Sequence, residues 1–305
     1  MTMAPGMAEA RFPIMGSTGH VMIVGGSSTL VEEARMHLRF LESRWTRFAS
    51  SSEISAINSR AGEPVPVGPE TRTLVDRMIF AWEATGGRFD PTVGAAMEMI
   101  GYDRSFDDGL SREGTLRPIP GDGCERIAVD HAGGTVMVPS SIVLDPGGIG
   151  KGLAADMVAE ALVAVGAAGA LVNVGGDLKV AGEGPEGGSW RIDNIEPVVA
   201  EGPVLQVLMP GGSGVATSTP LRRAWRLGDE PVHHLIDPVT GLPYRSVARL
   251  VSVVAADAWW AEACTKQIAG LAPQEAAGVL RNASALMVDA SGETHLLREM
   301  EAFAA

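Results

Sequence analysis

The sequence of 305 residues is poor in cysteine and has no long apolar run. Its two cysteines, Cys124 and Cys264, cannot build a disulfide framework and form no C-x-x-C pair, which favours a reducing compartment. No stretch of about 18 uncharged apolar residues is present that could cross a bilayer. The first residues lack the basic and apolar segments of a signal peptide, and there is no lipobox. We therefore expect a cytoplasmic protein that has no membrane partner.

Basic residues are outnumbered by acidic ones. Lys and Arg total 24 and Asp and Glu total 37, which gives a formal net charge of −13. This balance argues against a broad surface for nucleic-acid phosphates, so no nucleic-acid partner is expected. Any anionic ligand must instead be held by a few local donors. Hydrophobic residues make up 46 % of the chain, which is enough for a substantial core.

Strand and helix patterns alternate along the chain and predict an α/β (or α+β) fold with mixed sheets and packed helices. The 38 glycines cluster in loops without a fixed period, which excludes collagen and solenoid repeats. The length fits one large domain, or at most two. We expect a flexible N-terminus at 1–10, a folded domain at 11–290 and a C-terminal tail at 291–305.

Several elements can be placed from apolar spacing and from turn residues. Apolar positions three and four apart predict helices at 29–45 and 69–85, and a Gly-Gly pair ends the second one. The middle of the chain is most typical of a strand–helix–strand unit. Its strands are predicted at 141–144 and 170–174, and its helix at 153–165.

A glycine-rich turn precedes this middle helix. It runs from Asp145 to Gly152 and carries Lys151 at the point where helix N–H groups favour an anion. The spacing is not that of a Walker A loop, because Asp145 replaces the first glycine and Gly152 replaces the Ser or Thr. The turn therefore indicates a phosphate-binding site of another type. A tight turn with a surface lysine remains the alternative.

Two further turns carry polar residues at strand ends. The Gly175-Gly176 pair before Asp177 would let a ligand approach the backbone closely, although Asp177 could also simply cap the turn. His233 and His234 precede an Asp-Pro-x-Thr-Gly turn. Because adjacent residues of a strand face opposite sides, the two rings cannot serve one site. No zinc site is expected, since no further His or Cys lies nearby in the sequence.

A fourth group of polar residues lies on the last long predicted helix. Spacings of three and four residues place Glu262, Thr265 and Lys266 on one helical face. Such a face favours a functional cluster, and a solvent-exposed Glu–Lys pair is the alternative.

Taken in order, these segments resemble the ApbE family of FAD-dependent protein flavinyltransferases, from about residue 14 to residue 288. The matching blocks are Met15-Gly16-Ser17, Arg47-Phe48 with 52–58, Gly87 to Val93, Asp145 to Gly152, Leu171 to Asp177, Ala216-Thr217-Ser218 and His234 to Gly241. Each block alone is only suggestive, whereas seven blocks in the same order are specific.

The resemblance implies a T-fold-like ApbE architecture that binds FAD. Family members split FAD with the help of Mg²⁺ and attach FMN by a phosphoester to a Thr or Ser of a target protein, with release of AMP. The residues that the resemblance places around the flavin or adenine are Met15, Phe48, Arg88, Phe89, Asp90, Asp145, Lys151, Asp177, His234 and Ile236. The expected metal ligands are Gly148, Glu262 and Thr265, and the expected catalytic residues are His234, Glu262 and Lys266.

The sequence departs from the family at its metal-binding helix, which reads Asp-Ala-x-Ala-Thr in the family. Glu262 replaces the Asp, and Lys266 replaces the Thr. An ammonium group cannot coordinate a cation and repels one. Two interpretations follow. Either Lys266 acts as a built-in cation and transfer persists with altered metal dependence, or the protein binds FAD and has lost or altered transferase activity. His234 either orients the flavin end or assists proton transfer, or it has a structural role and caps the Asp237-Pro238 turn.

Overall fold

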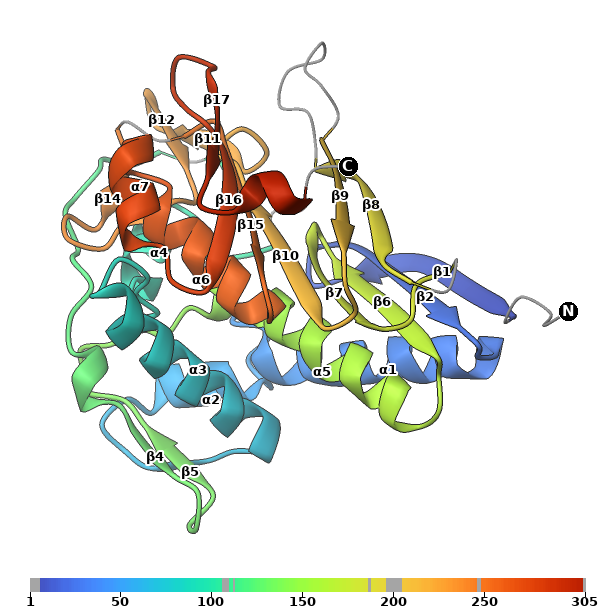
Figure 1. Ribbon diagram of the computed structural model, residues 1–305. Helices are drawn as coiled ribbons and strands as arrows, with labels where there is room; N and C mark the ends of the chain where they lie inside the picture. Colours follow the sequence, from blue (N-terminus) through green and yellow to red (C-terminus); the bar gives the residue numbers. More distant parts are fainter. Residues whose placement is uncertain are drawn as a thin grey trace, which may run out of the picture.

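A computed structural model of the chain shows an eight-stranded sheet with helices packed against one face (Figure 1). The structure describes residues 6–105, 110–111, 113–185, 188–195, 205–245 and 248–303. Neighbouring strands of this sheet pair antiparallel throughout the described residues. The strands in spatial order are β1 (Met7–Ile14), β2 (Ser17–Val24), β6 (Gly169–Val174), β7 (Asp177–Gly182), β10 (Ser213–Ser218), β15 (Leu250–Ala255), β16 (Ala283–Val288) and β17 (Thr294–Leu297).

The remaining elements are helices and short strand pairs around this sheet. The helices are α1 (Ser28–Trp45), α2 (Glu53–Ser59), α3 (Pro69–Thr85), α4 (Gly94–Met99), α5 (Gly150–Ala164), α6 (Ala258–Ile268) and α7 (Pro273–Val279). Short 3₁₀ turns are η2 (Cys124–Arg126), η3 (Pro146–Gly148) and η4 (Met300–Phe303). The small sheets are formed by β3 (Val65–Pro66), β4 (Ala128–Asp130) and β5 (Thr135–Met137), by β8 (Trp190–Ile195) and β9 (Leu205–Met209), by β11 (Ala224–Leu227) and β12 (Glu230–His233), and by β13 (Ile236–Asp237) and β14 (Leu242–Pro243).

The two faces of the large sheet are buried by different elements. Helices α1, α5 and α6 cover one face, and the β8–β9 pair lies over the other (Figure 1). Side chains of β6 alternate between the two layers, as the two-residue period of a strand requires. Val172 and Val174 pack under the helices, whereas Leu171 packs with Trp190 of β8. The residues of β6 are therefore fixed in register by burial on both sides.

The α/β class is confirmed, and the helices at 29–45 and 69–85 form as α1 and α3. Gly86 ends α3 with φ of 63°, the left-handed conformation that favours glycine. The expectation of mixed strand direction is wrong for the large sheet, because its ladders are antiparallel. The predicted strand at 141–144 is also wrong, since only a single bridge from Val143 to Val93 forms there.

The backbone N–H and carbonyl of Leu144 form hydrogen bonds with a side chain and not with a neighbouring strand. The Asn58 amide donates to the Leu144 carbonyl at 3.0 Å and accepts from the Leu144 N–H at 2.8 Å. A short apolar run can therefore be buried without joining a sheet. This contact fixes the chain directly before the glycine-rich turn that leads into α5.

Both expected domain ends fall inside ordered structure. Residues 7–10, expected in a flexible N-terminus, pair with β2 as part of β1. Residues 294–297, expected in a C-terminal tail, pair with β16 as β17. Residues 1–5 and 304–305 lie outside the described part of the chain. The sheet thus needs strands from both ends of the sequence, so the boundaries at 11 and 290 are too narrow.

A smaller apolar cluster lies beside the helical layer. It joins α4 to the β11–β12 pair through residues such as Met97, Ile100 and Trp225.

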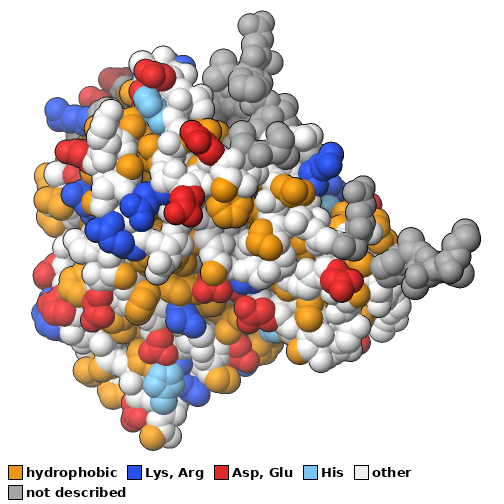
Figure 2. Space-filling model, viewed as in Figure 1, with side chains coloured by type: hydrophobic (Ala, Val, Ile, Leu, Met, Phe, Trp, Pro, Cys, Tyr) orange, Lys and Arg blue, Asp and Glu red, His pale blue; other side chains and the backbone are white. Residues whose placement is uncertain are grey.

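On the face drawn in Figure 2, acidic and basic side chains are interspersed, and neither sign covers the face. Among the residues that the structure describes, no helix has both the length and the apolar composition of a membrane span.

Candidate functional site

A pocket of about 310 Å³ lies between the helical layer and the β11–β14 strands. Its walls come from the end of α1, the η3 turn, the start of α5, the end of α6 and the loops around residues 88–93 and 234–238. Residues predicted from the sequence that line it are Met15, Phe48, Arg88, Phe89, Asp90, Asp145, Gly148, Lys151, His234, Ile236 and Lys266. Segments far apart in the sequence are therefore brought to one cavity.

One wall of the pocket is aromatic and carries a buried arginine. The Arg47 guanidinium lies 4.4 Å from the centroid of the Phe48 ring and 4.9 Å from that of Tyr102. Its Nε is 3.4 Å from an oxygen of Asp145. One terminal nitrogen, Nη2, is buried and has no hydrogen-bond partner among the described residues. Because a buried charged donor without a partner is costly, this atom indicates a place for an acceptor on a ligand.

The glycine-rich turn forms the floor beside this arginine. Asp145 caps η3 by accepting a hydrogen bond from the Gly147 N–H at 2.8 Å. Gly148 packs so closely that a Cβ there would lie 2.8 Å from the Phe89 ring. The turn leads directly into α5, whose first residues are Gly150 and Lys151. The N–H groups of a helix start together with a lysine favour an anion at this point.

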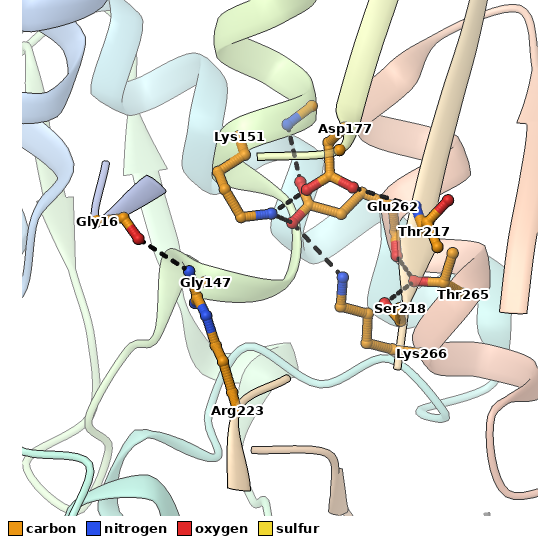
Figure 3. Close-up of polar contacts among 12 residues, drawn as sticks. Gly16, Gly147, Lys151, Asp177, Thr217, Ser218, Arg223, Glu262, Thr265 and Lys266 are labelled. Atoms are coloured by element: carbon orange, nitrogen blue, oxygen red, sulfur yellow. Dashed lines mark hydrogen bonds and ion pairs between the residues drawn. The ribbon is translucent and has the colours of Figure 1, made fainter. Parts of the chain in front are cut away.

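Lys151 connects this turn to two buried carboxylates (Figure 3). Its ammonium contacts Asp177, at the start of β7, and lies 2.8 Å from Glu262 Oε1 on α6. The other Glu262 oxygen accepts a hydrogen bond from the Gly152 N–H at 2.8 Å. Thr217 of β10 donates its N–H to Asp177 at 3.3 Å. The three charged groups thus hold α5, β7 and α6 together behind the pocket.

The pKa values in this cluster follow from burial and from the neighbouring charges. Burial alone would lower the pKa of Lys151, but Asp177 and Glu262 more than offset this and raise it. Burial and the charge of Glu262 raise the pKa of Asp177 to about 6. Burial alone would raise the pKa of Glu262, yet Lys151 and Lys266 lower it to about 2. Glu262 is therefore the firmly ionised carboxylate of the group.

Lys266 lies one helical turn after Glu262 and faces the pocket. Its Nζ is 3.5 Å from Glu262 Oε1, and its side chain is 20 % exposed. Thr265 points elsewhere, because consecutive helical residues are about 100° apart. Its hydroxyl is 2.7 Å from the Ser218 hydroxyl and donates to the Glu262 carbonyl at 2.7 Å. The structure therefore keeps Glu262 and Lys266 at the site and places Thr265, expected as a metal ligand, outside the pocket.

The donors around Glu262 do not fit a divalent cation. Its carboxylate accepts hydrogen bonds from the Lys151 ammonium and the Gly152 N–H, and its Oε1 also lies beside Lys266. Mg²⁺ requires oxygen ligands in a near-octahedral arrangement. A divalent ion about 4 Å from the Lys266 ammonium would be repelled by about 8 kcal/mol at an effective dielectric constant of about 20. The observed side chains thus supply an ammonium group where a metal would need an oxygen.

His234 lines the pocket from the segment between β12 and β13. Burial lowers its pKa well below 6.5, and the charges of Arg223 and Lys266 lower it further, so the imidazole is neutral at pH 7. Its Nδ1 is buried and has no hydrogen-bond partner among the described residues. The neighbouring His233 points away, and its Nε2 lies 3.1 Å from the Tyr244 carbonyl oxygen. Only one histidine of the pair therefore serves the pocket, as the sequence predicts.

The sequence prediction missed several residues of the cavity wall. Arg223 donates to the Tyr102 hydroxyl at 2.9 Å and to the Gly16 carbonyl at 3.4 Å, which ties the N-terminal hairpin to the β11 segment. Tyr244 also lines the cavity. None of these positions carries a local motif. Arg47 lies in a quoted block, and its basic side chain in an acidic chain is the signal that could have identified it.

Comparisons with known proteins agree with this geometry. The model of the ApbE family matches residues 15–288. A FAD:protein FMN transferase of Vibrio cholerae is 27 % identical over 258 residues, which cover 80 % of this chain and 75 % of that protein. Another from Salmonella typhimurium is 27 % identical over 296 residues, covering 92 % of this chain and 83 % of that protein. The crystal structure of the ApbE protein of Thermotoga maritima has a TM-score of 0.85 at 24 % identity, with 98 % of this chain and all of that chain covered. This chain therefore belongs to the ApbE family.

Proposed function

We propose that this chain transfers FMN from FAD to a Thr or Ser hydroxyl of a target protein and releases AMP. The observation that carries the proposal is the glycine-rich turn with Lys151 at the start of α5, in a pocket where Arg47 and His234 each have a buried nitrogen with no hydrogen-bond partner in the described part of the chain. These groups would complement an anionic, nitrogen-rich ligand. Relatives named FAD:protein FMN transferase support the same reaction.

The pocket has apolar lining residues for the ring systems of FAD and polar lining residues for its hydrogen-bonding and charged groups. Phe48, Phe89, Met15 and Ile236 offer apolar surface on which an aromatic ring system could pack. The polar lining residues Arg88, Asp90, Asp145 and His234 could hydrogen-bond to ring or ribose atoms, while Lys151 would face the diphosphate. Asp177 would act through Lys151, because it is buried behind that lysine. These assignments are part of the proposal.

The reaction forms one phosphoester bond and breaks one phosphoanhydride bond. The acceptor hydroxyl oxygen bonds to the phosphorus of the FMN half, and the bond from this phosphorus to the bridging oxygen breaks. The electron pair remains on the phosphate oxygen of AMP, and the hydroxyl proton leaves to a base. Positioned cations stabilise the charge on the transferring group and on the departing phosphate. Lys151 and the N–H groups of α5 are placed to contribute this stabilisation.

Two expected catalytic residues take different parts in this proposal. His234 is neutral and has a buried nitrogen that no described residue hydrogen-bonds, so it could accept the acceptor proton or orient the flavin. Glu262 is fully buried, so it acts as a positioning residue that holds Lys151 and Lys266. Because it cannot reach the substrate directly, its effect on the reaction passes through these two lysines.

The test uses the purified full chain, FAD and an acceptor protein with an Asp-Gly-x-Thr-Ser-Gly-Ala-Thr-like segment. AMP release is followed by chromatography, and covalent flavin is followed by in-gel fluorescence of the denatured acceptor. Both products should appear in equal amounts, and an acceptor with its Thr and Ser residues changed to Ala should give neither. FAD binding without AMP release under any condition would contradict transfer and leave a flavin-binding protein. Absence of FAD binding would overturn both interpretations.

A further inference from the structure

The place beside Glu262 is already filled by cationic and N–H donors. Lys151 is 2.8 Å from Oε1, the Gly152 N–H is 2.8 Å from Oε2, and Lys266 is 3.5 Å from Oε1. Both carboxylate oxygens therefore have partners within the protein. A further cation at this carboxylate would have to displace at least one of them.

The charges of the cluster also balance without a metal. Lys151 and Lys266 bring two positive charges, and Asp177 and Glu262 bring two negative charges, all within one connected group. The carboxylates thus have no surplus negative charge to attract a divalent ion. The FAD diphosphate would instead meet ammonium groups that are already held in position.

Lys266 is placed to reach such a diphosphate. It lines the pocket, and its Cε would lie 3.8 Å from a Cβ on Gly148, in the glycine-rich turn. An ammonium group has three N–H donors, and Glu262 is the partner that Lys266 has among the described residues. The remaining donors are available to an anion that lies on the turn.

We propose that Lys266 replaces a divalent cation at the FAD diphosphate, so that FMN transfer by this chain proceeds without Mg²⁺. This inference rests on the proposed function. As the acceptor oxygen bonds to the FMN phosphorus and the bond to the bridging oxygen breaks, the Lys266 ammonium donates hydrogen bonds to the diphosphate oxygens and stabilises the electron pair left on AMP. No atom is oxidised or reduced, and the acceptor proton passes to a base or to water.

The test compares the wild type with Lys266→Thr, which puts a hydroxyl in place of the ammonium. AMP release and covalent flavin are measured in excess EDTA and again with MgCl₂. The wild type should change less than twofold between the two conditions. Lys266→Thr should lose at least tenfold in EDTA and should regain activity with MgCl₂. Arg191→Thr removes the same unit of charge from an exposed position on β8 and should behave as the wild type.

Two results would overturn the inference. One is a wild type that loses its activity in EDTA and recovers it with MgCl₂, and the other is a Lys266→Thr variant that is fully active in EDTA. Lys266→Gln, which is uncharged and long enough to pack in the same space, replaces Lys266→Thr if circular dichroism shows that the threonine variant is unfolded.

FAD binding separates failure of this inference from failure of the proposed function. Affinity is measured from flavin fluorescence in EDTA, without any acceptor. A tenfold weaker affinity in Lys266→Thr, with wild-type affinity unchanged by MgCl₂, supports the contact between Lys266 and the diphosphate. Equal affinity in both proteins contradicts that contact. If the wild type releases no AMP under any condition, metal-free transfer is overturned together with the proposed function, whatever the affinities show.

Discussion

Glu262 is the residue on which the charges of the site converge. It is fully buried, and its two oxygens accept from Lys151 and from the Gly152 N–H while Lys266 lies beside it. Removing one charge from a buried ion pair leaves its partner uncompensated, which costs more than the pair itself contributes. Glu262 therefore matters for stability as well as for the position of the two lysines.

Glu262→Gln should lower the free energy of unfolding by about 3 kcal/mol, because two partly buried ammonium groups would then share the single carboxylate of Asp177. Urea unfolding followed by circular dichroism measures the change. Glu32→Gln is the matched control, since the Glu32 pair with Arg35 on α1 is exposed and should change stability by less than about 1 kcal/mol. Equal midpoints and slopes for Glu262→Gln and the wild type would contradict the role given to Glu262.

The buried Nη2 of Arg47, which has no hydrogen-bond partner among the residues that the structure describes, leads to a prediction on FAD affinity. Arg47→Leu should weaken FAD binding by about tenfold or more, because it removes a charge-assisted donor worth about 1.5–3 kcal/mol. Flavin fluorescence titration measures the affinity. Arg77 lies over the Trp259 ring at 4.8 Å, outside the residues that line the pocket, so Arg77→Leu should keep the affinity within twofold. Equal weakening in both variants would show that Arg47 acts only through packing.

His234 leads to a prediction on pH. Burial lowers its folded pKa well below 6.5, so in the unfolded chain it takes up a proton at higher pH than in the folded one. Stability is therefore lost as the pH falls through about 6.5. Between about pH 7.5 and 5.5 the wild type should lose about 1 kcal/mol more stability than His234→Gln. Urea unfolding at both pH values measures the two losses, and equal losses would contradict a buried neutral imidazole.

At the scale of elements, a buried carboxylate of α5 holds the start of α6. Asp156 of α5 accepts hydrogen bonds from the N–H groups of Ala258 and Trp259, both at 2.9 Å, at the start of α6. Burial raises the pKa of Asp156 to about 7, although Lys179 and these two N–H groups act in the opposite direction. Because α5 carries Lys151 and α6 carries Lys266, this junction sets how the two lysines face each other.

Asp156→Ala should destabilise the fold by about 3 kcal/mol, because it leaves two buried N–H groups at the start of α6 without acceptors. Thermal and urea unfolding measure the loss. Glu160, one turn later on α5 and 63 % exposed, supplies the control: Glu160→Ala should cost less than about 1 kcal/mol. A similar small loss in both variants would mean that water replaces Asp156 at the helix start.

The sequence predicted helices better than strands, and the physical reason is burial. The faces of α1 and α3 repeat every three to four residues, so their periodicity is visible. The residues of β15 are buried along its whole length, so no alternation marks it as a strand. In contrast, β1 alternates exposed residues with half-buried or buried ones at an edge of the sheet, and the sequence gave no prediction there. The apolar run at 141–144 was assigned to a strand because no sequence pattern reveals the Asn58 side chain that satisfies it.

The site was predicted by its motifs, whereas its contacts were not. Lys151 and Glu262 lie 111 positions apart, and only the packing of α5 on α6 brings them together. Helical spacing correctly related Glu262 to Lys266, but it could not show that Thr265 turns towards Ser218. Arg223 and Tyr102 carry no motif at all, so their contribution to the wall depends on the tertiary fold.

At the scale of the whole molecule, the net charge of −13 coexists with two lysines, Lys151 and Lys266, held at the pocket. Acidic and basic side chains alternate on the face in Figure 2, so no broad positive surface is needed for the ligand. Pocket residues come from positions 15 to 269, which means that the site is completed only when most of the chain has folded. The family match over residues 15–288 covers the same span.

The few basic groups are also unevenly divided between arginine and lysine. The chain has three lysines, Lys151, Lys179 and Lys266, and their side chains are 17 %, 4 % and 20 % exposed. Reductive methylation with ¹³C-formaldehyde would therefore give at most three lysine side-chain NMR signals, two of them from the site. The chemical shifts of these two methylated amines would report directly on the arrival of a diphosphate. Because the other basic residues are arginines, which this reaction does not methylate, Lys151 and Lys266 can serve as spectroscopic probes of the pocket.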